Sequence, residues 1–333
     1  MTNAQNPDDM APDSMANIDI LLATYNGAAF LEAQLDSILA QTHKNWRLVI
    51  RDDGSTDKTP EIIEAFRARH PDKVVVLEDE AGNLGLVQNF SRLMEHAGAG
   101  YVALCDQDDV WKPEKLELSL QKMRDMEAGH GADKPLLVFT DLTVVDEDLR
   151  NIHPSFWCYQ GVRPDQCNTL GKVLFQNVVT GCTALMNRPL VEKSMPIPGG
   201  AVVHDWWVAL VAVAFGAAGY IAQPTVLYRQ HRKNILGARD VHVFNLPARG
   251  SLLWRNYSAK KDSFSDYFRQ ADAFYVRFCS NFSDTHRQSI ATFLQIPHQK
   301  IFGRISHARR CGCLPYGILR KAVFLLLSRS ASR

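Results

Sequence analysis

Short apolar runs alternate with segments of helical periodicity over the first half of the chain. The apolar runs predict strands at residues 18–23, 46–52, 73–79, 101–106 and 136–141. Between the first two runs, apolar residues recur at helical spacing at Leu31, Leu35, Ile38 and Leu39. Further helices are expected after Asp57, over residues 86–96 and from Lys112-Pro113. Such alternation predicts an α/β fold, with a mostly parallel sheet flanked by helices.

The alternation weakens beyond residue 150. Residues 151–200 are rich in aromatic residues, Pro and Gly, which suggests loops that line a pocket. Further along we expect a strand-pair element at 178–187, a buried helix at 204–215, two short strands at 219–231 and mainly helix from 245 onward. The predicted organisation is a flexible leader (1–16), one α/β domain (17–240) and a helical, basic C-terminal extension (241–333).

The charge of the chain is unevenly distributed. The formal net charge is only +1, yet the residues after Asp284 include nine Lys or Arg and no Asp or Glu. Such asymmetry indicates an anionic partner for the tail, either a membrane surface or nucleic acid. Few aromatic residues lie between these cations, which disfavours nucleic acid. A membrane surface is therefore the expected partner, and a helical cap folded onto the body is the alternative.

The start of the chain and its cysteines indicate the cellular compartment in which the protein is expected. The polar start of the chain lacks the basic and apolar regions of a signal peptide, and no apolar run is long enough to span a bilayer. Seven cysteines, mostly in apolar surroundings, suggest reduced core thiols. Cys311-Gly-Cys313 lacks the second Cys pair of a typical zinc site. We therefore expect a cytoplasmic protein, with membrane contact at the cytoplasmic face of the inner membrane.

Polar clusters follow three of the predicted strands, at residues 24–26, 52–55 and 106–109. Ligands of open α/β sheets bind beyond the carboxyl ends of the strands, so these clusters predict a shared site. The third cluster contains Asp106, Asp108 and Asp109, whose like charges need compensation when they leave water. A divalent cation such as Mg²⁺ would supply it, and a solvated acidic turn is the alternative.

In order and combination, six motifs resemble those of family 2 glycosyltransferases with the Rossmann-like GT-A fold, particularly bacterial rhamnosyltransferase-like members. They are ATYNG (23–27), RDDGSTD (51–57), DQDDVW (106–111), TGC (180–182), HDWW (204–207) and YRQH (228–231). The resemblance covers residues 17–237. It implies an inverting transfer from a nucleotide-sugar, dTDP-rhamnose or a UDP-hexose. The implied acceptor is a saccharide or lipid-linked molecule of cell-envelope polysaccharide synthesis.

The resemblance also implies roles for individual residues. Asp205 matches the catalytic base, although His204 stands where the family usually has Glu. Asp106, Asp108 and His231 would hold Mg²⁺ or Mn²⁺. The expected acceptor side comprises Trp111, His204 and Trp206. The expected donor-binding residues are Thr24, Tyr25, Asn26, Asp52, Asp53, Asp106 and Gly181.

Simpler interpretations of these residues remain open. Asp205 could be a helix N-cap, Asp52 could cap a turn, and Gly181 could be an ordinary turn residue. LCDQDDV and FTD (139–141) also loosely match haloacid-dehalogenase-like phosphatases, although those chains place D-x-D near the start of the domain. A non-catalytic scaffold that binds nucleotide-sugars is a further alternative.

Overall fold

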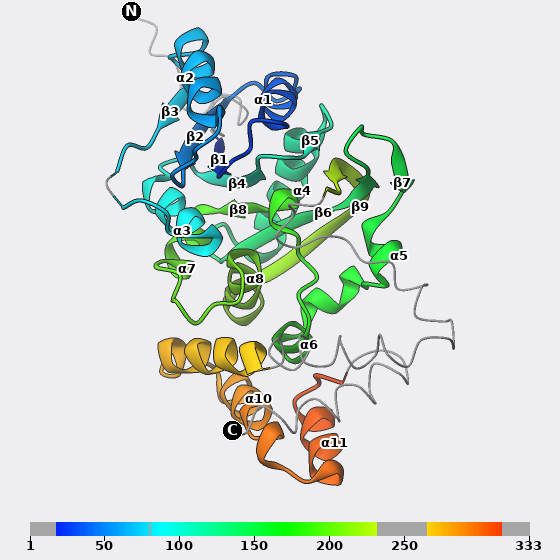
Figure 1. Ribbon diagram of the computed structural model, residues 1–333. Coiled ribbons are helices and arrows are strands. Elements are labelled where there is room, and N and C mark those ends of the chain that lie inside the picture. The colour runs from blue at the N-terminus through cyan, green and yellow to red at the C-terminus, as the bar shows by residue number, and fades with distance from the viewer. Residues whose placement is uncertain (1–17, 80, 232–264, 315–333) are drawn as a thin grey trace, which may run out of the picture.

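A computed structural model describes residues 18–79, 81–231 and 265–314, and one nine-stranded sheet organises them. The predicted leader (1–16) lies outside the described residues. The strand order is β3-β2-β1-β4-β8-β6-β9-β5, and β7 pairs with β6. Figure 1 shows this sheet with helices on both of its faces. The predicted α/β class with a mostly parallel sheet is therefore confirmed.

The first four strands of this order are parallel and end at one edge. They are β1 (Ile18–Thr24), β2 (Trp46–Asp52), β3 (Val74–Val76) and β4 (Tyr101–Asp106). The register pairs Thr24 with Asp52 and Ala23 with Asp106, so the carboxyl ends of β1, β2 and β4 are level. The prediction that the three polar clusters share one edge is confirmed.

Two hydrophobic cores lie on opposite faces of the sheet. Strand β1 is buried along its whole length: Ile18, Ile20 and Leu22 join one core, while Leu21 and Ala23 join the other. This two-sided burial explains why the strand has an almost continuous apolar sequence. The first core is covered by α1 (Leu31–Leu39), α2 (Thr59–Arg69) and α4 (Lys115–His130). The second is covered by α3 (Leu86–His96), α7 (Arg188–Ser194) and α8 (His204–Phe215).

The remaining strands depart most from the sequence-based expectations. Strand β8 (Leu185–Asn187) runs antiparallel to β4 and to β6 (Leu136–Val145), and β9 (Ala217–Arg229) runs parallel to β6. Strand β5 (Val110–Trp111) pairs antiparallel with β9, and β7 (Asn151–His153) with β6.

Three predictions for residues 151–231 are corrected. The expected strand pair at 178–187 is a 3₁₀ turn (Gly181–Thr183) followed by β8. The two strands expected at 219–231 form the single strand β9, in which a register shift accommodates Pro224, a residue that has no N–H to donate. The expected loops of 151–200 include the short helices α5 (Phe156–Gln160), α6 (Leu170–Phe175) and a 3₁₀ turn (Pro164–Asn168).

The described part of the C-terminal extension is helical and packs beside α8 (Figure 1). It consists of a helix over residues 265–278, α10 (Asp284–Leu294), a 3₁₀ turn (Ile296–His298) and α11 (Ile301–Arg310). The Trp207 ring lies 5.5 Å from that of Phe274 and 6.0 Å from that of Phe278. These helices therefore share one core with the α/β domain. Among the described helices, none combines the length and apolarity needed to cross a bilayer.

Candidate active site

Hydrogen bonds join the three polar clusters at the carboxyl edge of the sheet. The hydroxyl of Thr24 donates to Asp52 Oδ1 at 2.8 Å. The main-chain N–H of Asn26 donates to Ser55 Oγ at 2.8 Å, and that of Tyr25 to Gln107 Oε1, also at 2.8 Å. The Tyr25 side chain is 49% exposed, so its ring is accessible for stacking on a nucleotide base. Asn26 adopts a left-handed conformation (φ 49°), which Asn tolerates better than most residues.

Asp52 and Asp53 have different surroundings although they are adjacent. Asp52 accepts hydrogen bonds from the N–H of Ser55 at 2.8 Å and from its hydroxyl at 2.6 Å, so it caps this turn. Asp53 is 3% exposed, and its carboxylate accepts from Arg51 and from the main-chain N–H groups of Leu84 and Gly85. Both carboxylates therefore shape the loop itself, and a direct contact with a donor stays a prediction for each.

Asp108 and His231 come together although they are 123 residues apart in the sequence. His231 Nε2 lies 2.8 Å from Asp108 Oδ2, and the His231 ring packs 4.7 Å from that of Phe30. Arg229 fixes the same loop, because its Nε donates to the Asp108 carbonyl at 2.8 Å and its main-chain N–H to Asp109 Oδ1 at 3.1 Å. The end of β9 is thereby attached to the acidic loop after β4.

The interior side of this loop concentrates negative charge. Ligand atoms of Asp106, Asp109 and Cys182 all lie within 4.8 Å of one another. Burial, together with the charges of Asp108 and Asp205, raises the pKa of Asp106 to about 8. Burial also raises the pKa of the Cys182 thiol, which disfavours the thiolate form that binds soft metals. The oxygen-rich side of the cluster therefore suits a hard divalent cation.

Asp205 lies in the first turn of α8, directly beside Gly181. Its Oδ2 accepts the Gly181 N–H at 2.8 Å, and its Oδ1 accepts Asn177 Nδ2 at 3.0 Å. The N-cap position of α8 is Val203, so Asp205 is not the N-cap of this helix. Burial raises the pKa of Asp205 to about 6, although these hydrogen bonds favour its charged form.

Gly181 allows this close approach. A Cβ atom at this position would lie 2.9 Å from His204 Nε2 and 3.5 Å from Asp205 Oδ2, so a larger residue would displace one of these side chains. Gly181 is therefore more than an ordinary turn residue, and its proximity to a donor sugar stays a prediction.

The structure buries all three residues of the expected acceptor side, so their contact with an acceptor stays a prediction. Trp111 is 2% exposed, and the Lys115 ammonium lies 3.8 Å from its ring centroid. His204 is 3% exposed and stacks on Phe90 with a ring separation of 3.9 Å. Trp206 is 5% exposed and donates to the Val173 carbonyl. None of the three offers an open face to a saccharide.

Several residues of the site escape a sequence-based prediction. Asn177 orients Asp205, Arg229 holds the acidic loop, and Cys182 lies beside the predicted Asp106 and Asp109 on its buried side. Arg229 and Cys182 stand inside the YRQH and TGC motifs, so their position was a usable signal. Asn177 precedes its motif and has no such signal, because only the fold brings it to α8.

Comparisons with known proteins agree with this geometry. Residues 19–166 match the family described as Glycosyl transferase family 2. The dTDP-rhamnosyl transferase RfbG of Shigella flexneri is 29% identical over 228 residues, which are 65% of this chain and 74% of that protein.

Solved structures share the fold. S. aureus TarS, crystallised with UDP-GlcNAc, superposes with a TM-score of 0.57 at 13% identity over 85% of this chain and 72% of that one. The mannosyltransferase PcManGT of Pyrobaculum calidifontis, in complex with GDP-Man and Mn²⁺, gives a TM-score of 0.51 at 18% identity, over 97% of this chain and 82% of that one.

Proposed function

From the premise that the chain carries a family 2 glycosyltransferase domain of the GT-A fold, we propose that it is an inverting glycosyltransferase. The donor is a nucleotide-sugar, either dTDP-rhamnose or a UDP-hexose, and the acceptor is a saccharide or lipid-linked molecule of cell-envelope polysaccharide synthesis. The likeness to a dTDP-rhamnosyl transferase supports the rhamnose donor. The UDP-GlcNAc bound to a structural neighbour supports the UDP-sugar alternative.

One observation carries this proposal. Asp205 accepts the Gly181 N–H at 2.8 Å, and ligand atoms of Cys182, the next residue, lie within 4.8 Å of those of Asp106 and Asp109, so the first turn of α8 and the acidic loop after β4 meet at the same short turn. A displacement at a sugar needs a group that stabilises the departing diphosphate and a base near the attacking hydroxyl. Here the two kinds of group converge from segments that are far apart in the sequence.

Asp205 performs the base chemistry. An acceptor hydroxyl forms a bond to the anomeric carbon while the bond from that carbon to the diphosphate oxygen breaks. Asp205 Oδ takes the hydroxyl proton, and the electron pair of the broken bond leaves with the nucleotide diphosphate. One displacement inverts the anomeric configuration. Asn177 and Gly181 hold the carboxylate in place for this step.

Asp106, Asp108 and His231 would hold a divalent metal ion. Asp108 Oδ2 and His231 Nε2 are hydrogen-bonded at 2.8 Å, so the two side chains already lie side by side, and carboxylate and imidazole groups are ligands that Mg²⁺ or Mn²⁺ can take. When bound, the metal would neutralise charge on the departing diphosphate. Thr24, Tyr25, Asn26, Asp52 and Asp53 would border the nucleotide.

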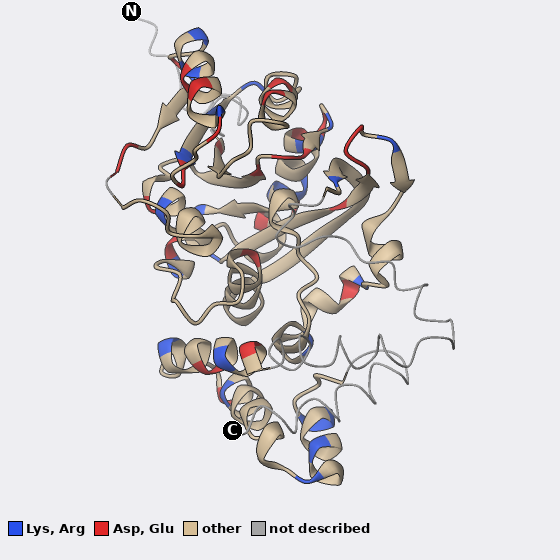
Figure 2. Cartoon of the chain, in the orientation of Figure 1, with Lys and Arg blue, Asp and Glu red and all other residues tan. Residues whose placement is uncertain are grey.

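The site of action is the cytoplasmic face of the inner membrane, where a lipid-linked acceptor would lie. Helix α11 supports this part of the proposal. Phe302 on this helix is 83% exposed, and Arg309 and Arg310 are exposed in its last turn. Figure 2 shows basic but no acidic residues along α11. An apolar side chain flanked by cations suits anionic lipid.

Transfer assays with UDP-, dTDP- and GDP-sugars test the function. We expect transfer or slow donor hydrolysis with Mn²⁺, and loss of both with EDTA or with Asp108→Ala. Asp133→Ala is the control, because this acidic residue is exposed and belongs to no part of the site. Full activity under both treatments would reject the metal role. Release of phosphate from a generic phosphoester would favour a phosphatase, and donor binding without turnover would favour a scaffold.

A further inference from the structure

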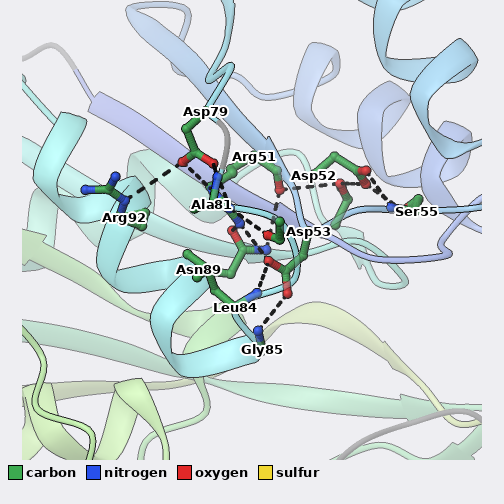
Figure 3. Close-up of polar contacts among 12 residues, drawn as sticks. Arg51, Asp52, Asp53, Ser55, Asp79, Ala81, Leu84, Gly85, Asn89 and Arg92 are labelled. Atoms are coloured by element: carbon green, nitrogen blue, oxygen red, sulfur yellow. Dashed lines mark hydrogen bonds and ion pairs between the residues drawn. The ribbon is translucent and has the colours of Figure 1, made fainter.

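Arg51 is a buried cation that the transfer chemistry does not use. It lies in β2, one residue before Asp52, and it is 1% exposed. Its guanidinium forms a two-point ion pair with Asp79, Nε to Oδ2 and Nη2 to Oδ1, both at 2.9 Å. Nη1 donates to Asp53 Oδ1 at 2.7 Å and to Asn89 Oδ1 at 3.2 Å, and Nη2 donates to the Gly82 carbonyl at 3.0 Å (Figure 3). One side chain therefore joins β2, α3 and the segment between β3 and α3.

The partners of Arg51 attach that segment at further points. Asp79 Oδ1 accepts the Ala81 N–H at 3.1 Å. Asp53 accepts the Leu84 N–H on Oδ1 and the Gly85 N–H on Oδ2, both at 2.8 Å. The segment has no regular secondary structure among its described residues, and Gly82 and Gly85 have positive φ values of 63° and 75°. Its shape therefore depends on these contacts with Arg51, Asp53 and Asp79.

The segment lies against the turn that the proposed function assigns to the nucleotide. Asp53 belongs to this turn, and the main-chain nitrogen of Asn83 is 3.9 Å from the position of a Cβ atom on Gly54. Asp52, the other neighbour of Asp53, is hydrogen-bonded to Thr24 and Ser55. A shift of the 79–85 segment would thus move the Asp53 carboxylate and the turn that carries it.

We propose that Arg51 is a positioning residue for donor binding, which acts by holding Asp53 and the 79–85 segment against the turn at residues 52–55. The proposal rests on the proposed function, in which this turn borders the nucleotide. Arg51 suits the role because its planar guanidinium addresses two carboxylates and a carbonyl in fixed directions, which a lysine cannot do. Arg51 itself touches neither the donor nor the reacting atoms.

A second ion pair in the same strands, in which the carboxylate is buried and the arginine side chain is 38% exposed, provides a control. At the amino ends of β1 and β2, Asp19 accepts from Arg47 Nε and Nη2, both at 2.8 Å. Asp19 also accepts two successive main-chain N–H groups, from Gly98 at 2.7 Å and Ala99 at 3.0 Å. This arrangement repeats the chemistry of Arg51 and Asp53 at the opposite edge of the sheet. If the role of either ion pair were purely structural, its loss would lower stability and leave nucleotide affinity unchanged.

The test compares nucleotide affinity in Asp79→Asn, Arg51→Lys and Arg47→Met. Asp79→Asn keeps the shape of the side chain, removes its charge from beside Arg51 and Arg92, and retains one acceptor oxygen, so it is the variant expected to remain folded. Calorimetric titration with dTDP and with UDP, each with Mn²⁺, measures affinity, and thermal unfolding measures stability. We expect Asp79→Asn and Arg51→Lys to weaken binding of the preferred nucleotide about tenfold, which corresponds to about 1.4 kcal/mol. The turnover number at saturating nucleotide-sugar should change less than about twofold, because the base and metal ligands are untouched.

Arg47→Met should lower the unfolding temperature and leave nucleotide affinity within about twofold of the wild type. Unchanged affinity in both Asp79→Asn and Arg51→Lys would overturn the proposal. An equal loss of affinity in Arg47→Met would also overturn it, because the effect would then follow from general destabilisation. If the wild type transferred sugar but the variants bound nucleotide normally, only the positioning role would fail. A wild type that bound neither nucleotide would reject the proposed function and this proposal with it.

Discussion

Asp205 combines burial with hydrogen bonds that favour its charged form, and this balance suits a general base. Replacement by Asn keeps the side-chain size and removes the ability to take a proton. We expect Asp205→Asn to lower the turnover number by about 10²- to 10⁴-fold, the usual range for general-base catalysis. The donor KM should change little, because the carboxylate acts on the acceptor hydroxyl. Steady-state kinetics with varied donor separates the two effects, and equal losses in both would contradict the base assignment.

The pH profile tests the same residue independently. Burial raises the pKa of Asp205 to about 6. The base must be deprotonated, so at saturating Mn²⁺, which keeps Asp106 charged, activity should be level above this pH and fall about tenfold per unit below it. The acidic limb should disappear from the residual activity of Asp205→Asn. A wild-type profile that stayed flat well below pH 6 would show that a different group takes the proton.

At the scale of elements, the 3₁₀ turn at Gly181–Thr183 sets the position of α8 and its first turn. Gly181→Ala would place a Cβ 2.9 Å from the buried His204 ring, which stacks on Phe90 and has little room to move. We expect a lower turnover number and a loss of about 1–3 kcal/mol in the free energy of unfolding, as for other overpacked sites. Kinetics and thermal unfolding measure the two effects.

Gly199→Ala is the matched control for this variant. A Cβ at Gly199 meets no described atom within 4 Å, so activity and stability should stay close to those of the wild type. If Gly181→Ala behaved like Gly199→Ala, the close contact between the turn and α8 would have no functional consequence.

Sequence periodicity predicted the parallel half of the sheet and α8 but not the antiparallel additions. Strand β1 and helix α8 are buried on most sides, so their apolar runs are unambiguous. Strand β5 has two residues, and β8 has three, which is too short for a periodic pattern. The polar clusters after β1, β2 and β4 were correctly predicted to share one edge of the sheet. The burial of the acceptor-side tryptophans was not predictable, because a sequence cannot distinguish a buried aromatic ring from an exposed one.

At the scale of the whole molecule, the C-terminal helices have one face in the core and another in solvent. The core face of these helices packs against α8: Phe274 and Phe278 contact Trp207, and Phe282 stacks on Phe215, the last residue of α8. On the other face, Phe302 of α11 is exposed. The predicted helical cap and the predicted membrane contact are therefore compatible, since they use different faces. The predicted tail beyond residue 314 lies outside the described residues.

Vesicle binding tests the exposed face. We expect the protein to co-sediment with phosphatidylcholine vesicles that contain phosphatidylglycerol and not with phosphatidylcholine alone. Each basic residue near an anionic surface contributes about 1 kcal/mol, so Arg309→Glu with Arg310→Glu should weaken binding by about tenfold or more. Phe302→Ser should also weaken it. High salt should weaken binding of the wild type, because these contacts are largely electrostatic.

The control is a double charge reversal of the same size on another helix. Arg67 and Arg69 lie in the last turn of α2, as Arg309 and Arg310 do in α11. Arg67→Glu with Arg69→Glu should leave vesicle binding nearly unchanged. An equal effect of the two double variants would mean that net charge, rather than the α11 face, controls membrane contact.

The proposed chemistry requires that the acidic end of β4 and His231 hold a divalent ion against a nucleotide diphosphate. A crystal grown with Mn²⁺ and dTDP or UDP tests it directly, because the anomalous signal of manganese locates the ion. We predict a peak in coordination contact with Asp108, His231 and the diphosphate, with the nucleotide base beside Tyr25. A bound nucleotide whose diphosphate lay away from Asp106 and Asp108, with no manganese peak at these carboxylates, would contradict the account.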